Sequence, residues 1–169
     1  MPLPEAEHIV IVGAMGSGKT TLARALAGKL QRPLFDSDRS IEERTGRRGR
    51  EIAEGDGVEA LHRLEKEVLL EPLDGPNPAV VAAAASVIED SAVRDALQGA
   101  FCVWVTADPE ILAERAARGE HRRSVGRSEH LERRDPLFRQ VADLVVDTGV
   151  LSEREALDMV LRAMGEGEN

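Results

Sequence analysis

The segment at residues 13–20 constrains this chain most, because its glycine spacing is typical of a loop that few folds contain. It reads G-A-M-G-S-G-K-T and fits the pattern G-x-x-x-x-G-K-[ST]. An apolar run at 9–12 precedes it, and leucines at helical spacing follow it from 20 to 30. A loop between a buried strand and a helix N-terminus presents backbone N–H groups to an anion. The segment predicts a phosphate-binding loop; the alternative is a glycine-rich turn that matches by chance.

Nucleotide phosphates are the anions that loops of this pattern bind. In such loops the lysine ammonium, here Lys19, bridges the β- and γ-phosphates, and the hydroxyl of Thr20 coordinates Mg²⁺. The loop therefore predicts that the chain binds the phosphates of a nucleotide together with Mg²⁺. The residues expected to bind the nucleotide in and beside the loop are Gly13, Met15, Gly16, Ser17, Gly18, Lys19, Thr20 and Thr21.

Apolar runs of strand length alternate with helical patterns along the rest of the chain. Further strands are expected at 33–35, 79–82, 101–105 and 144–146. Residues 39–74 have helical spacing interrupted by glycines, and helix-start signals stand at 108–109 and 152–155. Five buried-type strands separated by helices predict a three-layer α/β sandwich with a parallel sheet. We expect one domain over residues 1–169.

Composition limits the classes of partner. The chain has 22 basic and 31 acidic residues, a formal net charge of −9, which disfavours binding to a nucleic-acid backbone. The longest apolar run, 79–87, is too short to cross a membrane. The N-terminal residues lack the pattern of a secretion signal, and the lone Cys102 cannot form an internal disulfide. We expect a cytoplasmic monomer with neither nucleic acid nor membrane as a partner.

Two aspartates, Asp36 and Asp38, follow the second expected strand. They should lie at the edge where open parallel sheets bind ligands, and period-two alternation would point both carboxylates toward the phosphate loop. Asp36 would then help Thr20 to bind Mg²⁺, while Asp38 would orient or deprotonate an acceptor hydroxyl. The alternative interpretation is an N-cap pair that opens the helical segment.

Arginine is concentrated in one part of this acidic chain. Seven arginines lie between residues 115 and 134: Arg115, Arg118, Arg122, Arg123, Arg127, Arg133 and Arg134. Arginine suits a planar, bidentate grip on phosphate and carboxylate. Glycines at 119 and 126 punctuate the segment, as a mobile lid requires. The pattern predicts a lid that carries arginine to the phosphates, against the alternative of a solvated helical face.

Taken together, these motifs resemble the shikimate kinase family of small P-loop kinases. The resemblance rests on the phosphate loop and the residues after it at 13–21, the D-x-D at 36–38, the T-G-R and D-G between 45 and 57, and the run at 134–148. It implies a five-stranded parallel sheet, a helical substrate-binding segment at about 39–75 and a lid at about 119–128. It also implies ATP-dependent phosphorylation of a hydroxyl on a small molecule.

The resemblance also implies roles for individual positions. Lys19 would hold phosphate and Asp38 would meet the acceptor hydroxyl, both as catalytic residues. Thr20 and Asp36 would bind Mg²⁺. The arginines would take three places: Arg115 or Arg118 under the adenine, Arg123 (or Arg122) as the catalytic arginine of the lid, and Arg134 at the substrate carboxylate.

The acceptor half of the sequence departs from the family pattern. His62 stands where the family has the arginine that grips the shikimate carboxylate, and Ala84, Ala85 and Ser86 replace a Gly-Gly-Gly run. Imidazole is mostly neutral at pH 7, and each lost charge-assisted hydrogen bond costs roughly 1.5–3 kcal/mol. The sequence therefore predicts a kinase of a small polyol or hydroxy acid that need not be shikimate. His62, Ala84 and Ala85 would line its acceptor pocket.

Three alternatives stay open. Gluconate kinases and other sugar or cyclitol kinases have a similar loop and a Val-Val-Ala run like that at 80–82. The second alternative is a nucleotide-binding regulatory module without catalysis, against which the presence of both Lys19 and Asp38 argues. The third is an authentic shikimate kinase that anchors the substrate carboxylate less firmly, through Arg134 and Arg63.

Overall fold

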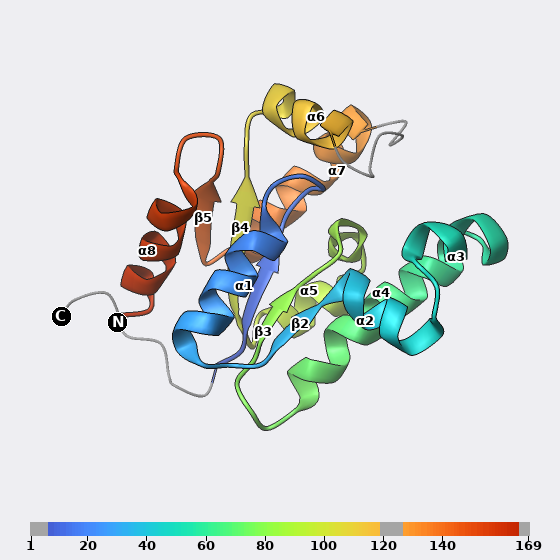
Figure 1. The fold of residues 1–169 in the computed structure, drawn as a ribbon, viewed down its shortest axis with the longest axis horizontal. Coiled ribbons are helices and arrows are strands. Elements are labelled where there is room, and N and C mark those ends of the chain that lie inside the picture. The colour runs from blue at the N-terminus through green and yellow to red at the C-terminus, as the bar shows by residue number, and fades with distance from the viewer. Residues whose placement is uncertain (1–6, 119–126, 166–169) are drawn as a thin grey trace.

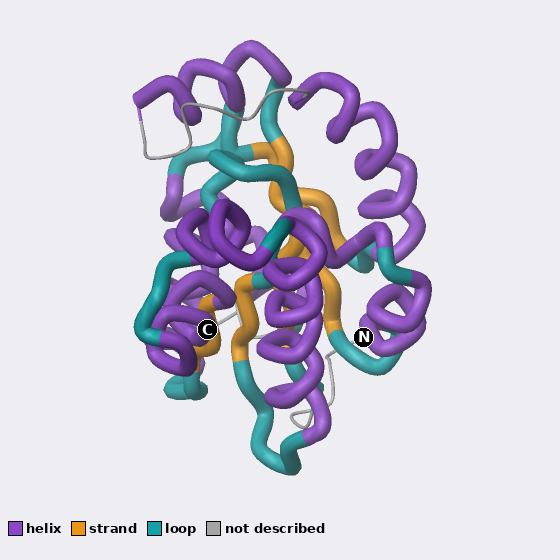
Figure 2. The backbone as a smooth tube through the Cα atoms, turned by 90° about the vertical axis from the view of Figure 1, so that its right-hand side faces the viewer, coloured by secondary structure: helices purple, strands orange, loops and turns teal. Residues whose placement is uncertain are grey.

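The computed structural model describes residues 7–118 and 127–165. Its five strands form one all-parallel sheet in the order β2-β3-β1-β4-β5. The strands are β1 (Ile9–Val12), β2 (Leu34–Asp36), β3 (Val80–Ala82), β4 (Phe101–Thr106) and β5 (Leu144–Asp147). Helices cover both faces of this sheet (Figures 1 and 2), so the predicted three-layer α/β sandwich with a five-stranded parallel sheet is confirmed.

The helical elements follow the strands in the order that a parallel sheet requires. They are α1 (Lys19–Leu30), α2 (Ser37–Thr45), α3 (Gly49–Asp56), α4 (Val58–Asp74), the 3₁₀ helix η1 (Ala85–Glu89), α5 (Ser91–Leu97), α6 (Pro109–Arg118), α7 (Arg127–Val141) and α8 (Glu153–Ala163). The predicted capping box at the start of α8 is present, with the Ser152 hydroxyl accepting from the backbone N–H of Glu155 at 3.1 Å.

Side-chain alternation in β1 builds the two halves of the core. Ile9 and Ile11 pack on one face against α1 and α8, while Val10 and Val12 pack on the other against residues of α4, α5 and α7. All four are essentially inaccessible to solvent. A strand buried on both faces reads as a continuous apolar run, which is why residues 9–12 could be assigned from the sequence.

The predicted helical stretch at 39–74 is three helices separated by glycines. Gly46 caps α2 with φ +72°, a left-handed conformation that glycine adopts without strain, and Gly57 separates α3 from α4. Ile41, Ile52 and Val68 form a small core between the three helices. In Figure 1 this unit stands beside the β2 edge of the sheet.

The elements that carry the predicted site lie at the carboxyl ends of the strands. The loop between β1 and α1, the 3₁₀ helix η1 and the helices α6 and α7 lie toward the end where the strands terminate (Figure 1).

Within the described ranges, no helix combines the length and the apolar character that crossing a bilayer requires.

Candidate active site

The phosphate loop is shaped by glycine at its first position. Gly13 has φ +148°, and a Cβ there would lie 2.2 Å from the carbonyl oxygen of Val105 on β4. At the far end Gly18 is the N-cap of α1 with φ +98°, and no side chain caps the helix. The first N–H groups of α1 therefore stay available to an anion seated in the loop.

Ser17 adds a buried polar group to this loop. Its side chain is buried, and the hydroxyl oxygen has no hydrogen-bond partner among the described residues. A buried hydroxyl without a partner is costly in a protein interior. An unsatisfied hydroxyl within a loop of backbone N–H groups fits a bound phosphate oxygen.

Lys19 lies folded over the phosphate loop. Its ammonium group donates hydrogen bonds to the carbonyl oxygens of Gly13 at 2.8 Å and Ala14 at 3.0 Å. Burial lowers the pKa of Lys19 to about 8, against the opposing effect of the nearby Asp38 and Asp36 carboxylates. The nearby carboxylates therefore do not fully offset the cost of burying the ammonium charge. Phosphate oxygens bound in the loop would add the missing negative charge.

Asp36 combines the two roles that the sequence left open. Its Oδ2 accepts a 2.7 Å hydrogen bond from the Thr20 hydroxyl, and its Oδ1 accepts from the backbone N–H of Arg39 at 3.3 Å as the N-cap of α2. Neighbouring hydroxyl and carboxylate oxygens are ligands that Mg²⁺ accepts beside phosphates and water. Thr20 and Asp36 therefore fit the predicted metal site.

The predicted reason for the placement of Asp38 is wrong, although it does lie near the loop. The strand β2 ends at Asp36 and α2 begins at Ser37, so Asp38 stands in the first turn of a helix rather than two residues along a strand. Helical geometry, not period-two alternation, places its carboxylate where its charge acts on Lys19.

A second set of contacts joins the phosphate loop to the turn after β5. One guanidinium nitrogen of Arg115, Nη1, donates to the carbonyl oxygen of Gly16 at 3.1 Å and to Thr148 Oγ1 at 2.9 Å. The Thr148 hydroxyl in turn donates a 2.6 Å hydrogen bond to the carbonyl oxygen of Ser17. Arg115 is one of the predicted site residues, whereas Thr148 is not. Arg118 is exposed at the last residue of α6.

On the acceptor side, Glu65 of α4 and Ser86 of η1 form a pair that sequence analysis did not assign. The Ser86 hydroxyl donates to Glu65 Oε1 at 2.7 Å, and burial raises the pKa of the Glu65 carboxyl. His62 Nε2 lies 4.0 Å from the same oxygen, and burial and the charge of Arg134 lower the pKa of His62. The imidazole is therefore neutral at pH 7, while its side chain is 45% exposed.

The predicted carboxylate contact, Arg134 of α7, is paired within the protein. Its Nε and Nη2 donate to Oε2 of Glu89 at 3.2 and 3.1 Å, and Arg133 Nε donates to Oε1 of the same carboxylate at 3.0 Å. Glu89 is the last residue of η1 and was not among the predicted site residues.

Of the two predicted pocket alanines at the start of η1, Ala84 is half-buried and Ala85 is buried.

Comparisons with known proteins agree with this arrangement of loop, sheet and helices. The family model described as shikimate kinase matches residues 15–165. A shikimate kinase from Symbiobacterium thermophilum is 32% identical, covering 94% of this chain and 97% of the relative. One from Burkholderia lata is 36% identical, covering 91% and 88%. The structure of Acinetobacter baumannii shikimate kinase in complex with shikimate superposes with a TM-score of 0.87 at 29% identity, covering 96% and 95%.

The chain belongs to the shikimate kinase family. It is therefore an enzyme, a phosphotransferase that phosphorylates a hydroxyl on a small polyhydroxylated molecule with ATP. This function was the main prediction from the sequence, and it holds over the sugar-kinase and regulatory alternatives. Membership also implies the use of ATP and typically of Mg²⁺.

Part of this shikimate kinase family member's predicted site lies outside the described residues. Arg122 and Arg123, the two candidates for the lid arginine, belong to that part, as does the lid expected at about 119–128 up to the start of α7 at Arg127. The charges of four side chains act on Lys19, those of Asp36, Asp38, Glu65 and Arg134. The fold therefore places these side chains near the phosphate loop.

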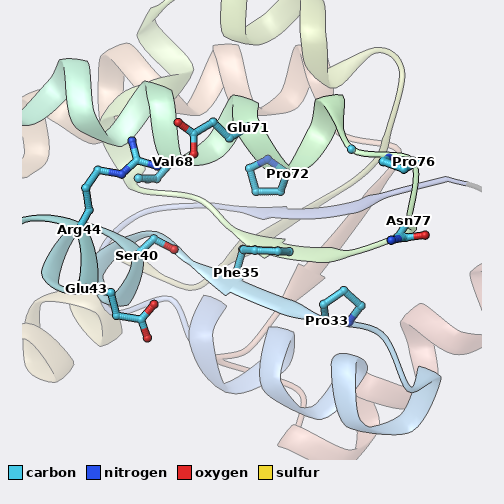
Figure 3. Close-up of a pocket in the computed structure, with 11 residues that line it drawn as sticks. Pro33, Phe35, Ser40, Glu43, Arg44, Val68, Glu71, Pro72, Pro76 and Asn77 are labelled. Carbon is cyan, nitrogen blue, oxygen red and sulfur yellow. Dashed lines mark hydrogen bonds and ion pairs between the residues drawn. The ribbon is translucent and has the colours of Figure 1, made fainter.

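A separate groove lies away from these residues, along the exposed edge of β2 (Figure 3). It has a volume of about 630 Å³ and is bounded by β2, α2, α4 and the turn after α4. Phe35 faces it from β2, and Arg44 crosses it to pair with Glu71 (Figure 3).

Proposed function

We propose that this enzyme transfers the γ-phosphoryl group of ATP, with Mg²⁺, to a ring hydroxyl of an acceptor of the size and hydroxylation of shikimate. The observation that carries the proposal is the electrostatic environment of Lys19. The charges of Asp38, Asp36, Arg134 and Glu65 all act on its ammonium group, so a phosphate group on the loop and an acceptor beside Glu65 would share one site. The Acinetobacter baumannii relative, with shikimate bound, supports an acceptor of this class.

The nucleotide half of the proposal uses the phosphate loop. The N–H groups at the start of α1 and the ammonium group of Lys19 would bind the phosphates, and the Ser17 hydroxyl would gain the partner it lacks among the described residues. Thr20 and Asp36 would hold Mg²⁺, which when bound neutralises charge on the phosphates. Arg115 and Arg118 would flank the adenine.

The acceptor half uses side chains from α2, α4, η1 and α7. Asp38 would accept a hydrogen bond from the reacting hydroxyl and orient its oxygen for in-line attack. Glu65 is a buried carboxyl that accepts a hydrogen bond from the Ser86 hydroxyl. It would accept another hydrogen bond, from a hydroxyl of the acceptor molecule that does not react. His62, Ala84 and Arg134 would line the pocket, and Arg123 would reach the transferred group from the lid.

A coupled assay of ADP release tests this proposal. Purified protein with MgATP is offered shikimate, gluconate and a panel of cyclitols, and the phosphorylated product is identified by mass spectrometry and ³¹P NMR. Acceptor-dependent ADP release with a phosphorylated shikimate-class ring is the expected result, and Lys19→Ala should abolish it. Nucleotide binding without acceptor-dependent turnover across the panel would overturn the proposal in favour of a regulatory module.

A further inference from the structure

We propose that Thr148 is a positioning residue for nucleotide binding: its hydroxyl fixes the carbonyl group of Ser17 and thereby aims the backbone N–H of Gly18 at the phosphates. Thr148 acts through the phosphate loop and needs no contact of its own with the nucleotide. The inference rests on the proposed function, which gives the loop its ligand. It adds to the nucleotide site a residue that stands 131 positions after Ser17 in the chain.

The turn that carries Thr148 is tied to the sheet and to itself. The backbone N–H of Thr148 donates a 2.9 Å hydrogen bond to the carbonyl oxygen of Thr106, beside the last residue pair of β4 and β5. The Asp147 carboxylate accepts from the backbone N–H of Gly149 at 2.8 Å, and the Asp147 carbonyl oxygen accepts from that of Leu151 at 2.9 Å. A rigid support therefore presents the threonine hydroxyl to the phosphate loop.

The side chain of Thr148 contacts the loop at two consecutive residues. Its hydroxyl donates a 2.6 Å hydrogen bond to the carbonyl oxygen of Ser17, while the other acceptor within reach, the Thr106 carbonyl oxygen, is 3.4 Å away. The same hydroxyl accepts from Nη1 of Arg115 at 2.9 Å, so its single proton stays directed at Ser17. A Cβ built on Gly18 would lie 3.7 Å from the Thr148 methyl carbon, which shows how closely the side chain packs on the loop backbone.

The carbonyl group that Thr148 holds belongs to the same peptide unit as the N–H of Gly18. No cis peptide bond occurs in the described ranges, and in a trans peptide the C=O and the N–H point in opposite directions. The Gly18 N–H therefore points away from Thr148. No backbone carbonyl oxygen of the described residues accepts from it, whereas the N–H of Ser17 donates to the carbonyl oxygen of Ala14 at 3.2 Å. Because Gly18 is the N-cap of α1, its N–H joins those of the first helical turn, where an anion binds.

Arg115 supports a different peptide unit of the loop. Its Nη1 donates to the carbonyl oxygen of Gly16 at 3.1 Å and lies 3.5 Å from that of Ser17, while its Nη2 donates to the carbonyl oxygen of Thr148 at 2.9 Å. Without the Thr148 hydroxyl, the Ser17 carbonyl would keep only the 3.5 Å contact, which exceeds the usual range of about 2.7–3.2 Å. The hydroxyl is therefore the group that fixes this peptide unit.

Two substitutions of Thr148 separate its hydroxyl from its shape. Thr148→Val keeps the branched shape and removes the hydroxyl, whereas Thr148→Ser keeps the hydroxyl. Titration calorimetry measures the dissociation constants of pyrophosphate and of ADP, each with Mg²⁺. In Thr148→Val both constants should rise at least about tenfold, because a hydrogen bond to a charged oxygen is misdirected. In Thr148→Ser both should stay within about threefold of the unaltered protein.

The two ligands distinguish the two groups that the hydroxyl contacts. Pyrophosphate has no adenine, so its affinity does not depend on a guanidinium group beside the base. If Thr148→Val weakened the binding of ADP alone, Thr148 would act through Arg115 and the proposal would be overturned. Unchanged affinity for both ligands in Thr148→Val, or an equal loss in Thr148→Ser, would overturn it as well.

Ser152→Ala is the matched control for a general loss of stability. Ser152 follows Thr148 in the same connection between β5 and α8, and its hydroxyl caps the first turn of α8. This variant should unfold at a lower denaturant concentration and still bind pyrophosphate within about twofold of the unaltered protein. Pyrophosphate affinity that falls in step with stability in both Ser152→Ala and Thr148→Val would reduce Thr148 to a structural role.

The amide resonance of Gly18 gives a readout at the atom concerned. Saturating pyrophosphate should shift it in ¹⁵N–¹H spectra of the unaltered protein and of Thr148→Ser, and less than half as far in Thr148→Val. An equal shift in all three proteins would contradict the orientation assigned to this N–H. Pyrophosphate binding requires no acceptor. The expected binding pattern without phosphoryl transfer to any acceptor would therefore refute the proposed function and leave the role of Thr148 standing.

Discussion

The ammonium group of Lys19 donates a 2.8 Å hydrogen bond to the carbonyl oxygen of Gly13, so the lysine at the end of the phosphate loop contacts the first residue of the loop. The contact keeps a cation in a buried position, and that burial lowers the pKa of Lys19 to about 8. Phosphate oxygens would offer the same ammonium group a full negative charge. Nucleotide binding is therefore expected to raise this pKa and to be coupled to proton uptake.

We predict that affinity for an ATP analogue falls as the pH rises through 8. Because binding requires the charged lysine, the dissociation constant should be about tenfold higher at pH 9 than at pH 7. Calorimetry in buffers of different ionisation enthalpy measures the proton uptake directly. An affinity that is flat from pH 7 to 9, or binding without proton uptake at pH 8.5, would contradict the role assigned to Lys19.

Replacing Asp36 by Asn should separate metal binding from helix capping. Asparagine caps helices about as well as aspartate, so the free energy of unfolding should change by less than about 1 kcal/mol. The carboxylate charge beside Thr20 is lost, and the Mg²⁺ concentration for half-maximal activity should rise at least tenfold. Activity measured against Mg²⁺ at saturating ATP, beside a denaturant titration, checks both parts. An unchanged Mg²⁺ requirement would exclude Asp36 from the metal site.

Two glycines near each other in the chain should respond in opposite ways to alanine. In Gly13→Ala the new methyl group would lie 2.2 Å from the Val105 carbonyl oxygen at φ +148°, and we expect a loss of at least about 3 kcal/mol of stability. Gly28 is exposed within α1, and an added Cβ meets nothing within 4 Å. Gly28→Ala should be neutral or stabilising by up to about 1 kcal/mol. Equal unfolding midpoints for the two variants would refute this account of the loop.

The thiol of Cys102 should be unreactive in the folded protein. It lies fully buried in β4, and burial raises its pKa to about 12, with the Asp143 carboxylate acting in the same direction. Because the thiolate is the reactive form, a thiol reagent at pH 8 should label native protein at least a hundredfold more slowly than protein in denaturant. Rapid stoichiometric labelling of the native state would show that β4 opens readily.

The features that sequence reasoning predicted correctly are those encoded by neighbouring residues. The strand at 9–12, the phosphate loop and the capping box at Ser152 each depend on a few consecutive positions. The prediction for Asp38 was wrong because the extended backbone ends at Asp36 and the helix α2 begins at Ser37. Asp38 was interpreted as part of an extended segment and stands in a helix. The helical run of α7, which contains Pro136, was not bounded from the sequence either.

By itself, then, the sequence determined the fold class, the phosphate loop and the family, because glycine spacing and apolar alternation act through the backbone of the residues that carry them. Only the tertiary structure decided which charged side chains meet. Glu89 and Arg134 stand 45 positions apart, and Thr148 and Ser17 stand 131 apart. Such contacts depend on how η1, α7 and the end of β5 pack on the sheet, so no local pattern shows that the acceptor side contains a carboxylate already bound to its arginine.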